Sequence, residues 1–251
     1  MYECENEKNT EKINNLPLIG DKAPDFIANT TDGIIKFPSD YAGHWVILFS
    51  HPMDFTPVCT SEFISFQSML SDFQELNTEI IGLSVGAVFS HLAWFKAIHD
   101  EITFNGLKNI SIEFPVIEDL DMRVSKLYGM VHPNTSDTKT VRAVFIIDPD
   151  GIIRTILYYP QTTGRNIKEI KRILIALQTT DNFGVSTPAD WVPGHPVIEP
   201  APRTFSDMQK RLKNAGKNLS IQSWFFTLRD LDELKIMRKI IKKNKNDKLK
   251  L

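Results

Sequence analysis

Short apolar runs rich in β-branched residues alternate with longer segments of helical period along most of this chain, and this alternation constrains its fold most. Residues 45–51, Trp-Val-Ile-Leu-Phe-Ser-His, form the clearest run, apolar nearly throughout like a strand that is covered on both faces. A segment of helical period follows from residue 59 to about 77, and further strand-and-helix units begin at residues 80 and 114. The pattern predicts an α/β fold with a largely parallel central sheet.

The chain departs from this alternation after residue 140. Two β-branched runs, 141–147 and 152–159, flank the compact turn Asp-Pro-Asp-Gly at 148–151, which predicts an antiparallel hairpin. A helix over residues 166–178 is expected to close this first domain.

Beyond the first domain the composition changes. Residues 188–202 are rich in proline and are interpreted as a linker or an extended arm. Two helices are expected after it, at 205–212 and 228–242. Between them, residues 224–226, Trp-Phe-Phe, are too apolar to be left in water, so we expect them to pack on another subunit. The lysine-rich residues 242–251 are expected to have no regular structure.

Length and charge place the chain in a broad class. Its 251 residues and net charge of -2 fit a flexible arm at 1–15, a main domain at 16–180 and a C-terminal extension at 181–251. No run reaches the roughly 18 to 20 apolar residues that cross a bilayer, and the N-terminus lacks the apolar core of a secretion signal, which predicts a cytoplasmic protein. No membrane or nucleic-acid partner is expected, since the charge is close to neutral.

The two cysteines, Cys4 and Cys59, are too few and too far apart for a disulfide scaffold or a four-ligand zinc site. Any cysteine chemistry therefore depends on a single thiol. Cys59 stands at the predicted start of a helix after a buried strand, where the helix dipole favours the nucleophilic thiolate. The competing interpretation is that Cys59 is a small core residue.

Three other cysteine chemistries fail on residues that they require. A dithiol oxidoreductase needs a second cysteine three positions away, where this chain has Thr56 and Glu62. A phosphatase of the Cys-x5-Arg kind needs an arginine where Ser65 stands. A papain-like protease needs a Cys-Gly-x-Cys-Trp surround, which residues 58–60 do not provide.

Residues 52–59 read Pro-Met-Asp-Phe-Thr-Pro-Val-Cys, a Pro-x-x-x-Thr-x-x-Cys motif, and with this motif the chain resembles the peroxiredoxins. The wider string 51–62 resembles their one-cysteine branch, the peroxiredoxin 6-like, long archaeal-type members. Further matches are His-Leu-Ala-Trp at 91–94, Arg142 on a later strand, and Thr-Thr-Gly-Arg-Asn at 162–166. Together the matches cover residues from about 16 to 191.

The resemblance implies a thioredoxin-like fold with a C-terminal extension used for dimerisation, and a thiol-specific peroxidase without haem, flavin or metal. Members of the family assemble through homodimers, often into rings of five or six dimers. Cys59 would attack hydrogen peroxide or an organic hydroperoxide. Thr56 would position the peroxide, Pro52 would shield the thiolate from water, and Arg142 would lower the pKa of the thiol.

The same resemblance assigns five residues to the substrate pocket: His51, Val58, Glu62, Trp94 and Arg165. Backbone N–H groups around Val58 and Cys59 would bind the peroxide oxygens, and Glu62 would hold an arginine through a bidentate carboxylate pair. His51 and Arg165 would line the pocket, and Trp94 would form its apolar wall. Simpler interpretations stay open, with His51 as a hydrogen-bonded end of a strand, Trp94 as core and Glu62 as a helix-terminal charge.

Attack would leave Cys59 as a sulfenic acid, which another thiol must reduce. Long archaeal-type members often carry two cysteines near the C-terminus, but Ser220 and Phe226 stand at those positions here. We therefore expect an external thiol as the reductant, with Cys4 as the alternative. His44 stands where a lipase serine would be, so no phospholipase activity is expected.

The contrasting hypothesis is a peroxide sensor or a ring-shaped holdase chaperone whose peroxidase activity is secondary. The lack of a built-in resolving cysteine supports it, because an enzyme with no reductant turns over once. Multiple-turnover peroxide loss with a small dithiol, compared with Cys59→Ser, discriminates between the two hypotheses.

Overall fold

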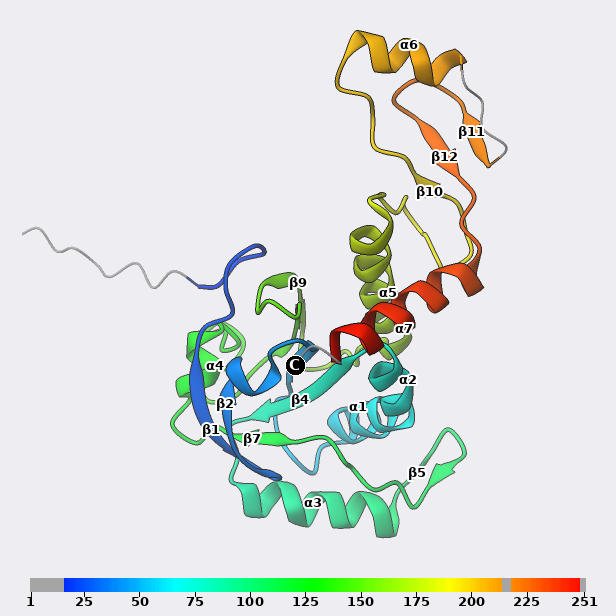
Figure 1. Cartoon of the computed structure of the whole chain (residues 1–251). Coiled ribbons are helices and arrows are strands. Elements are labelled where there is room, and N and C mark those ends of the chain that lie inside the picture. Colours follow the sequence, from blue (N-terminus) through cyan, green and yellow to red (C-terminus); the bar gives the residue numbers. More distant parts are fainter. Residues whose placement is uncertain (1–15, 214–217, 249–251) are drawn as a thin grey trace, which may run out of the picture.

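A computed structural model describes residues 16–213 and 218–248 of the chain. A body built around a seven-stranded sheet holds most of them. The smaller C-terminal unit stands out from this body except for its last helix, which lies back against it (Figure 1). The α/β fold predicted from the alternating pattern is confirmed. The arm predicted at 1–15, which includes Cys4, lies outside the described residues.

The large sheet has the strand order β2-β1-β7-β4-β3-β8-β9. Its strands are β1 (Phe26–Thr30), β2 (Gly33–Phe37), β3 (Trp45–Ser50), β4 (Thr78–Ser84), β7 (Val116–Glu118), β8 (Arg142–Ile147) and β9 (Ile153–Tyr159). Only β3, β4 and β7 run parallel, and the other neighbouring pairs are antiparallel. The expectation of a largely parallel sheet is therefore wrong.

Two hairpins make the sheet mixed. The predicted hairpin is confirmed as β8 and β9, and β8 pairs antiparallel with β3. The hairpin of β1 and β2 has no counterpart in the sequence predictions, although Thr31-Asp32-Gly33 is a turn signal. Gly33 has a φ of 97°, a left-handed value that glycine adopts without steric cost. The two hairpins flank the parallel strands on both sides.

Five helices of the body complete two hydrophobic cores. Helices α1 (Pro57–Ser68), α2 (Leu70–Glu75), α3 (Val88–Glu101) and α5 (Ile167–Phe183) contribute to one core, and α4 (Arg123–Leu127) contributes to the other. The helix expected over 59–77 is two helices, because the backbone leaves helical geometry at Met69 (φ -113°, ψ 9°). Helix α5 runs past its predicted end at 178, to the left-handed cap Gly184. The short elements are the 3-10 helix Ser39–Tyr41 and a two-stranded sheet of β5 (Thr103–Phe104) and β6 (Leu107–Lys108).

Strand β3 is buried on both faces, as its apolar sequence predicts. Ile47 and Phe49 belong to one hydrophobic core, and Val46 and Leu48 belong to the other. Each such buried side chain contributes roughly 1.5–3 kcal/mol to folding. Packing from both sides therefore fixes the end of β3 at Ser50 and the start of the loop that follows.

The C-terminal unit contains a small antiparallel sheet and two helices. The strand order is β10 (Val197–Ile198), β12 (Thr227–Arg229) and β11 (Leu219–Ile221), and the helices are α6 (Phe205–Lys213) and α7 (Glu233–Lys248). Helix α6 agrees with the prediction over 205–212. The helix expected from residue 228 begins only at Glu233, because residues 227–229 pair as a strand. Residues 242–248 are helical, so the expectation of an irregular tail is wrong there.

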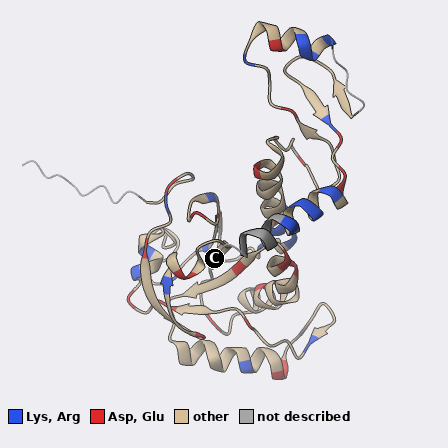
Figure 2. Ribbon diagram, in the orientation of Figure 1, with Lys and Arg blue, Asp and Glu red and all other residues tan. Residues whose placement is uncertain are grey.

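Helix α7 is held by its apolar face. Ile236 and Ile240, one turn apart, are buried in the same core as Leu174 of α5. Lys235 and Arg238 are exposed, and Figure 2 shows Lys and Arg side by side along this helix. The lysine-rich sequence thus continues a helix that is anchored by two isoleucines. None of the described helices is both long and apolar enough to cross a membrane.

Candidate active site

Cys59 lies in the first turn of α1, directly after the loop that leaves β3. Thr56 precedes the helix with an extended backbone (φ -109°, ψ 143°), and Pro57 begins it. A proline suits the first helical position, because its φ is already helical and no N–H is needed there. The Thr56 side chain does not cap the helix, since its hydroxyl donates to the carbonyl of Met53 at 2.8 Å. The first N–H groups of α1 therefore point toward the loop without acceptors inside the helix.

Arg142 contacts the sulfur of Cys59. Its Nη1 lies 3.3 Å from Sγ, and both residues are buried. Strand β8 pairs with β3, and Arg142 is its first residue, so the sheet brings the guanidinium to the end of β3. Nε and Nη2 donate to the carbonyl of Gln161 at 3.0 and 2.6 Å, which fixes the plane of the guanidinium.

Glu62 lies one helical turn beyond Cys59 and pairs with two arginines. Its Oε2 accepts from Nη1 of Arg142 at 2.8 Å and from Nη2 of Arg165 at 2.6 Å. Its Oε1 accepts from Nε of Arg165 at 2.9 Å and from the backbone N–H of Arg165 at 2.8 Å. The sequence predicted one arginine on Glu62, and the structure places two there.

The remaining donors of Arg165 are also occupied. Its Nη1 donates to the carbonyls of Ser50 and Ala143 at 3.0 and 2.9 Å, and its guanidinium lies 5.0 Å from the centre of the Phe49 ring. Burial raises the pKa of Glu62, but the guanidiniums of Arg165 and Arg142 outweigh burial and hold this pKa below its usual value. Glu62 is therefore an ionised anchor that holds Arg142 against the sulfur.

A cavity of about 480 Å³ opens beside the start of α1. Of the predicted site residues, Thr56 and Trp94 line it, together with Phe55, Thr60 and the last turn of α3, whereas Cys59 and Arg142 do not. Nε1 of Trp94 donates to Oγ1 of Thr60 at 3.2 Å, which ties α3 to α1. Phe104 of β5 closes one side. Most of the lining is apolar, which suits a small or alkyl-bearing ligand.

Pro52 and Val58, two further predicted site residues, lie beside the site and have apolar side chains. Pro52 is buried in the loop after β3, and the half-buried Val58 precedes Cys59 and lies against Gly164. Gly164 is the residue before Arg165, so Val58 touches the segment that holds Glu62.

Asp54, to which the sequence analysis gave no role, is the centre of a cluster of hydrogen bonds beside the site. Asp54 accepts from Nε2 of His51 at 2.9 Å, from Nδ1 of His91 at 2.8 Å and from Oγ of Ser90 at 2.7 Å. The ring of His51, which was predicted to line the pocket, lies 5.3 Å from the ring of Trp94. Asp54 stands inside the recognised motif, but the motif carries no signal for contacts with residues of α3.

The His51–Asp54–His91 cluster is also the group among the described residues with the side-chain types and spacing of a metal site. One ligand atom from each lies within 4.8 Å of the others. The distances of 2.8 and 2.9 Å from the ring nitrogens to the carboxylate are those of charge-assisted hydrogen bonds.

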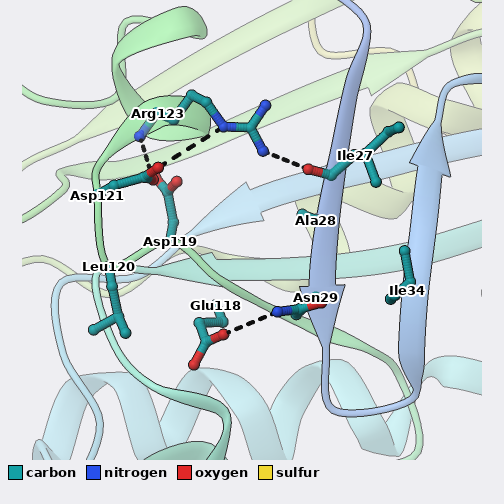
Figure 3. A pocket seen from close by; sticks show the side chains of 9 residues that line it. All are labelled: Ile27, Ala28, Asn29, Ile34, Glu118, Asp119, Leu120, Asp121 and Arg123. Carbon is teal, nitrogen blue, oxygen red and sulfur yellow. Dashed lines mark hydrogen bonds and ion pairs between the residues drawn. The ribbon is translucent and has the colours of Figure 1, made fainter.

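A second hollow of about 360 Å³ lies between β1 and the segment that connects β7 to α4 (Figure 3). Residues 27–29 of β1, Ile34 of β2, residues 118–121 and Arg123 line it, and Asn29 donates to Glu118 across it at 3.3 Å. None of the predicted site residues lines this hollow.

Comparisons with known protein families match the chain over two stretches. The AhpC/TSA family model matches residues 19–156, and the model of the C-terminal domain of 1-Cys peroxiredoxin matches residues 176–215. A peroxiredoxin of Methanosarcina mazei is 58% identical over 214 residues, which are 85% of this chain and 98% of the relative. A peroxiredoxin of Aquifex aeolicus is 50% identical over 212 residues, 80% of this chain and 93% of the relative.

Two solved structures are similar over almost their whole length. A yeast mitochondrial 1-Cys peroxiredoxin, studied for thiol resolution via glutathione/thioredoxin systems, has a TM-score of 0.74 and 37% identity, and covers 86% of this chain and 100% of that one. A cysteine-to-serine mutant of the peroxiredoxin 6 of Arenicola marina has a TM-score of 0.72 and 30% identity. This match covers 85% of this chain and 98% of that one. The implied thioredoxin-like fold with a C-terminal extension is confirmed.

Proposed function

Because this chain belongs to the peroxiredoxins, and to their one-cysteine branch, it is a thiol-dependent peroxidase, and we propose that Cys59 is the thiol that reduces the peroxide. The observation that carries this proposal is the contact of 3.3 Å between Sγ of Cys59 and Nη1 of Arg142. A guanidinium stays charged at physiological pH and stabilises an anion beside it. The thiolate is the attacking form of a cysteine, so this contact favours the reaction.

In the proposed reaction the Cys59 thiolate attacks one oxygen of hydrogen peroxide or of an organic hydroperoxide. The S–O bond forms as the O–O bond breaks, so the sulfur is oxidised to a sulfenic acid. The second oxygen leaves as hydroxide or alkoxide and takes up a proton to become water or an alcohol. Donors aimed at that oxygen lower the barrier, and we assign this role to the N–H groups of Val58 and Cys59.

The other predicted residues have supporting roles in this proposal. Thr56 positions the peroxide, since its hydroxyl donates to Met53 and its oxygen remains able to accept from the substrate. Pro52 shields the thiolate from water. Trp94 forms the wall of the cavity on the α3 side, and the fully buried His51 packs against Trp94 and supports it. Glu62 and Arg165 hold the guanidinium of Arg142 in place.

An external thiol is the proposed reductant. Cys59 is fully buried, so its sulfenic acid has to become accessible before a second thiol can reach it. That thiol displaces water from the sulfenic acid and forms a mixed disulfide, and a further thiol releases Cys59 with a disulfide as the product. A reducing compartment such as the cytoplasm supplies thiols of this kind.

We also propose a homodimer formed through residues 181–251, with residues 16–180 as the peroxidase domain. Trp224, Phe225 and Phe226 are 39%, 57% and 36% exposed in the single chain. Three adjacent exposed aromatic residues form a surface that a partner subunit would cover. Assembly of five or six such dimers into a ring is the larger arrangement that we propose.

The test is consumption of hydrogen peroxide over many turnovers with dithiothreitol as the electron donor. The wild-type protein and Cys4→Ser are expected to consume many equivalents at the same rate, and Cys59→Ser is expected to show no loss above background. Activity that survives Cys59→Ser would remove Cys59 from the reaction. Protection of an unfolding client protein by both wild type and Cys59→Ser, without peroxide turnover, would favour the holdase instead.

A further inference from the structure

We propose that Asp54 is a positioning residue for peroxide reduction, which ties the loop that carries Thr56 to helix α3 and fixes the protons of two buried histidines. The inference deepens the proposed function and rests on it. Asp54 lies in the middle of the loop between β3 and α1 and is almost fully buried. Its carboxylate joins His51, at the end of β3, to Ser90 and His91, in the first turn of α3.

The carboxylate determines which ring nitrogens carry protons. Burial raises the pKa of Asp54, but hydrogen bonds from His51 and His91 outweigh burial and hold that pKa well below its usual range. An ionised carboxylate can only accept, so Nε2 of His51 and Nδ1 of His91 both donate to it.

The opposite ring nitrogens have a different environment. Nδ1 of His51 and Nε2 of His91 are buried and have no hydrogen-bond partner among the described residues. A proton on either nitrogen would be buried without an acceptor, which is unfavourable. Asp54 therefore selects opposite neutral tautomers for its two histidines, Nε2–H in His51 and Nδ1–H in His91.

The same carboxylate restrains the loop that presents Thr56. Phe55, between Asp54 and Thr56, has a φ of 55°, a left-handed value that a bulky side chain rarely adopts. Such a conformation persists only where neighbouring contacts enforce it. Asp54 supplies these contacts on one side of Phe55, and the hydrogen bond from Thr56 to Met53 supplies one on the other.

Because Asp54 is bonded to the start of helix α3, it also affects the cavity residue that this helix carries. Trp94 follows His91 by one turn, donates to Thr60 at 3.2 Å and lines the cavity together with Thr56. The centre of the His51 ring lies 4.8 Å from the centre of the Phe63 ring. Two walls of the cavity, the loop before α1 and helix α3, are thus held in register through one carboxylate. A misplacement of about 1 Å in a reacting geometry can slow a reaction by about 100-fold.

The test compares Asp54→Asn with the same substitution at Asp148, a half-buried aspartate that also accepts several hydrogen bonds. Asp148 accepts from the N–H groups of Asp150 and Ile152 at 3.0 Å and from Arg154, and it follows β8 at the end away from Arg142. Asp148→Asn therefore removes a structural carboxylate without touching the cavity. The measured quantities are the rate constant for oxidation of Cys59 by hydrogen peroxide, the thiolate absorbance against pH, and the ¹⁵N shifts of the histidine rings.

Asp54→Asn is expected to slow Cys59 oxidation by about 10- to 100-fold with an unchanged thiolate titration. An amide cannot accept from both rings as a carboxylate does, so one histidine should lose its wild-type tautomer in the ¹⁵N spectrum. Asp148→Asn should keep the oxidation rate within about twofold of wild type. Both histidines should also keep their wild-type tautomers in this variant, even if its stability changes. Should Asp54→Asn not fold, Ser90→Ala and His91→Gln carry the same test, since each removes one donor to Asp54.

Oxidation of folded Asp54→Asn at the wild-type rate would overturn the inference, and so would an equal loss of rate in Asp148→Asn. Equal neutral tautomers for His51 and His91 in the wild-type spectrum would also overturn it. Wild-type protein that is not oxidised at Cys59 at all would instead contradict the proposed function, so the two failures are distinguishable.

Discussion

A single guanidinium nitrogen of Arg142 serves both the sulfur of Cys59 and the carboxylate of Glu62. The charge beside the thiol therefore depends on a carboxylate that two arginines hold in place. Arg142 and Arg165 lie 80 and 103 residues from Glu62 in the sequence. Nothing local in the chain predicts that these three residues meet, and only the resemblance to a family led to them. The pairing of β3 with β8 brings Arg142 to Cys59, and the segment before α5 brings Arg165 to Glu62.

Loss of the Arg142 charge is expected to slow the peroxide step strongly. Removing one donor that stabilises charge in a buried site typically costs about 100- to 1,000-fold in rate. We expect Arg142→Met to lower the rate constant for Cys59 oxidation by this factor, measured by stopped flow. Arg154→Met is the matched control, because Arg154 pairs with Asp148 and Asp181 at a half-buried position away from Cys59. A rate within a few-fold of wild type for Arg142→Met would contradict its role.

Glu62→Gln is expected to destabilise the fold. The substitution leaves two buried guanidiniums facing a neutral amide, and breaking a buried ion pair in this way typically costs about 3–5 kcal/mol. Urea unfolding should show a lower midpoint at pH 7. A midpoint equal to wild type would mean that the two arginines do not depend on Glu62.

The same residue makes stability depend on pH. The pKa of Glu62 is held below its usual value of 4.5 in the folded state, so its contribution is present above that pH and is lost as the pH falls through the folded pKa. We expect the melting temperature of the wild type to fall below pH 4.5, and that of Glu62→Gln to fall less steeply. Parallel melting curves for the two proteins over this range would contradict the assignment.

At the scale of elements, the loop between β3 and α1 decides what the thiol meets. The sequence predicts β3, its burial and the placement of Cys59 at the start of a helix, because apolar periodicity and helix-start residues are local signals. It does not predict the left-handed Phe55 or the hydrogen bonds of Asp54, because both depend on α3, which lies more than thirty residues further along. Local patterns therefore identify the proposed nucleophile but leave the walls of the cavity beside α1 undetermined.

The close packing at the start of α3 gives a prediction for this region. A Cβ at Gly86 would lie 3.1 Å from Cε1 of His91 and 3.2 Å from Oγ of Ser84, so one neighbour must move. We expect Gly86→Ala to cost about 1–3 kcal/mol in urea unfolding, the usual range for overpacking. Ser84→Ala in the same chain should recover part of this loss, because Oγ of Ser84 has no hydrogen-bond partner among the described residues. Wild-type stability of Gly86→Ala alone would contradict close packing of Gly86 against His91 and Ser84.

At the scale of the whole molecule, the sequence predicted the fold class but not the direction of its strands. A largely parallel sheet was expected because alternating strands and helices favour it. The chain adds a hairpin on each side, and the N-terminal hairpin has strands of five residues that carry a weak periodic signal. The lysine-rich tail was misjudged for a related reason. Its composition resembles a solvated end, but Ile236 and Ile240 bury one face on the body.

The exposed aromatic residues of the C-terminal unit give a prediction about assembly. We expect Phe225→Asp to shift the protein from dimer to monomer, because a buried carboxylate without a partner is costly in an interface. Light scattering after size-exclusion chromatography measures the change. Ile34→Asp, a similarly exposed apolar position on β2, is the control and should leave the dimer intact. A dimer that persists in Phe225→Asp would place the interface elsewhere.

The central claim is that peroxide oxidises Cys59 to a sulfenic acid that an external thiol resolves. The most direct measurement is the intact mass of the protein under non-reducing conditions after one equivalent of hydrogen peroxide, with a sulfenic-acid trap present and the modified peptide located. We predict one trap adduct, on Cys59 of the monomer. A disulfide between Cys59 and Cys4 would contradict the external reductant, and an unmodified Cys59 would contradict the peroxidase mechanism itself.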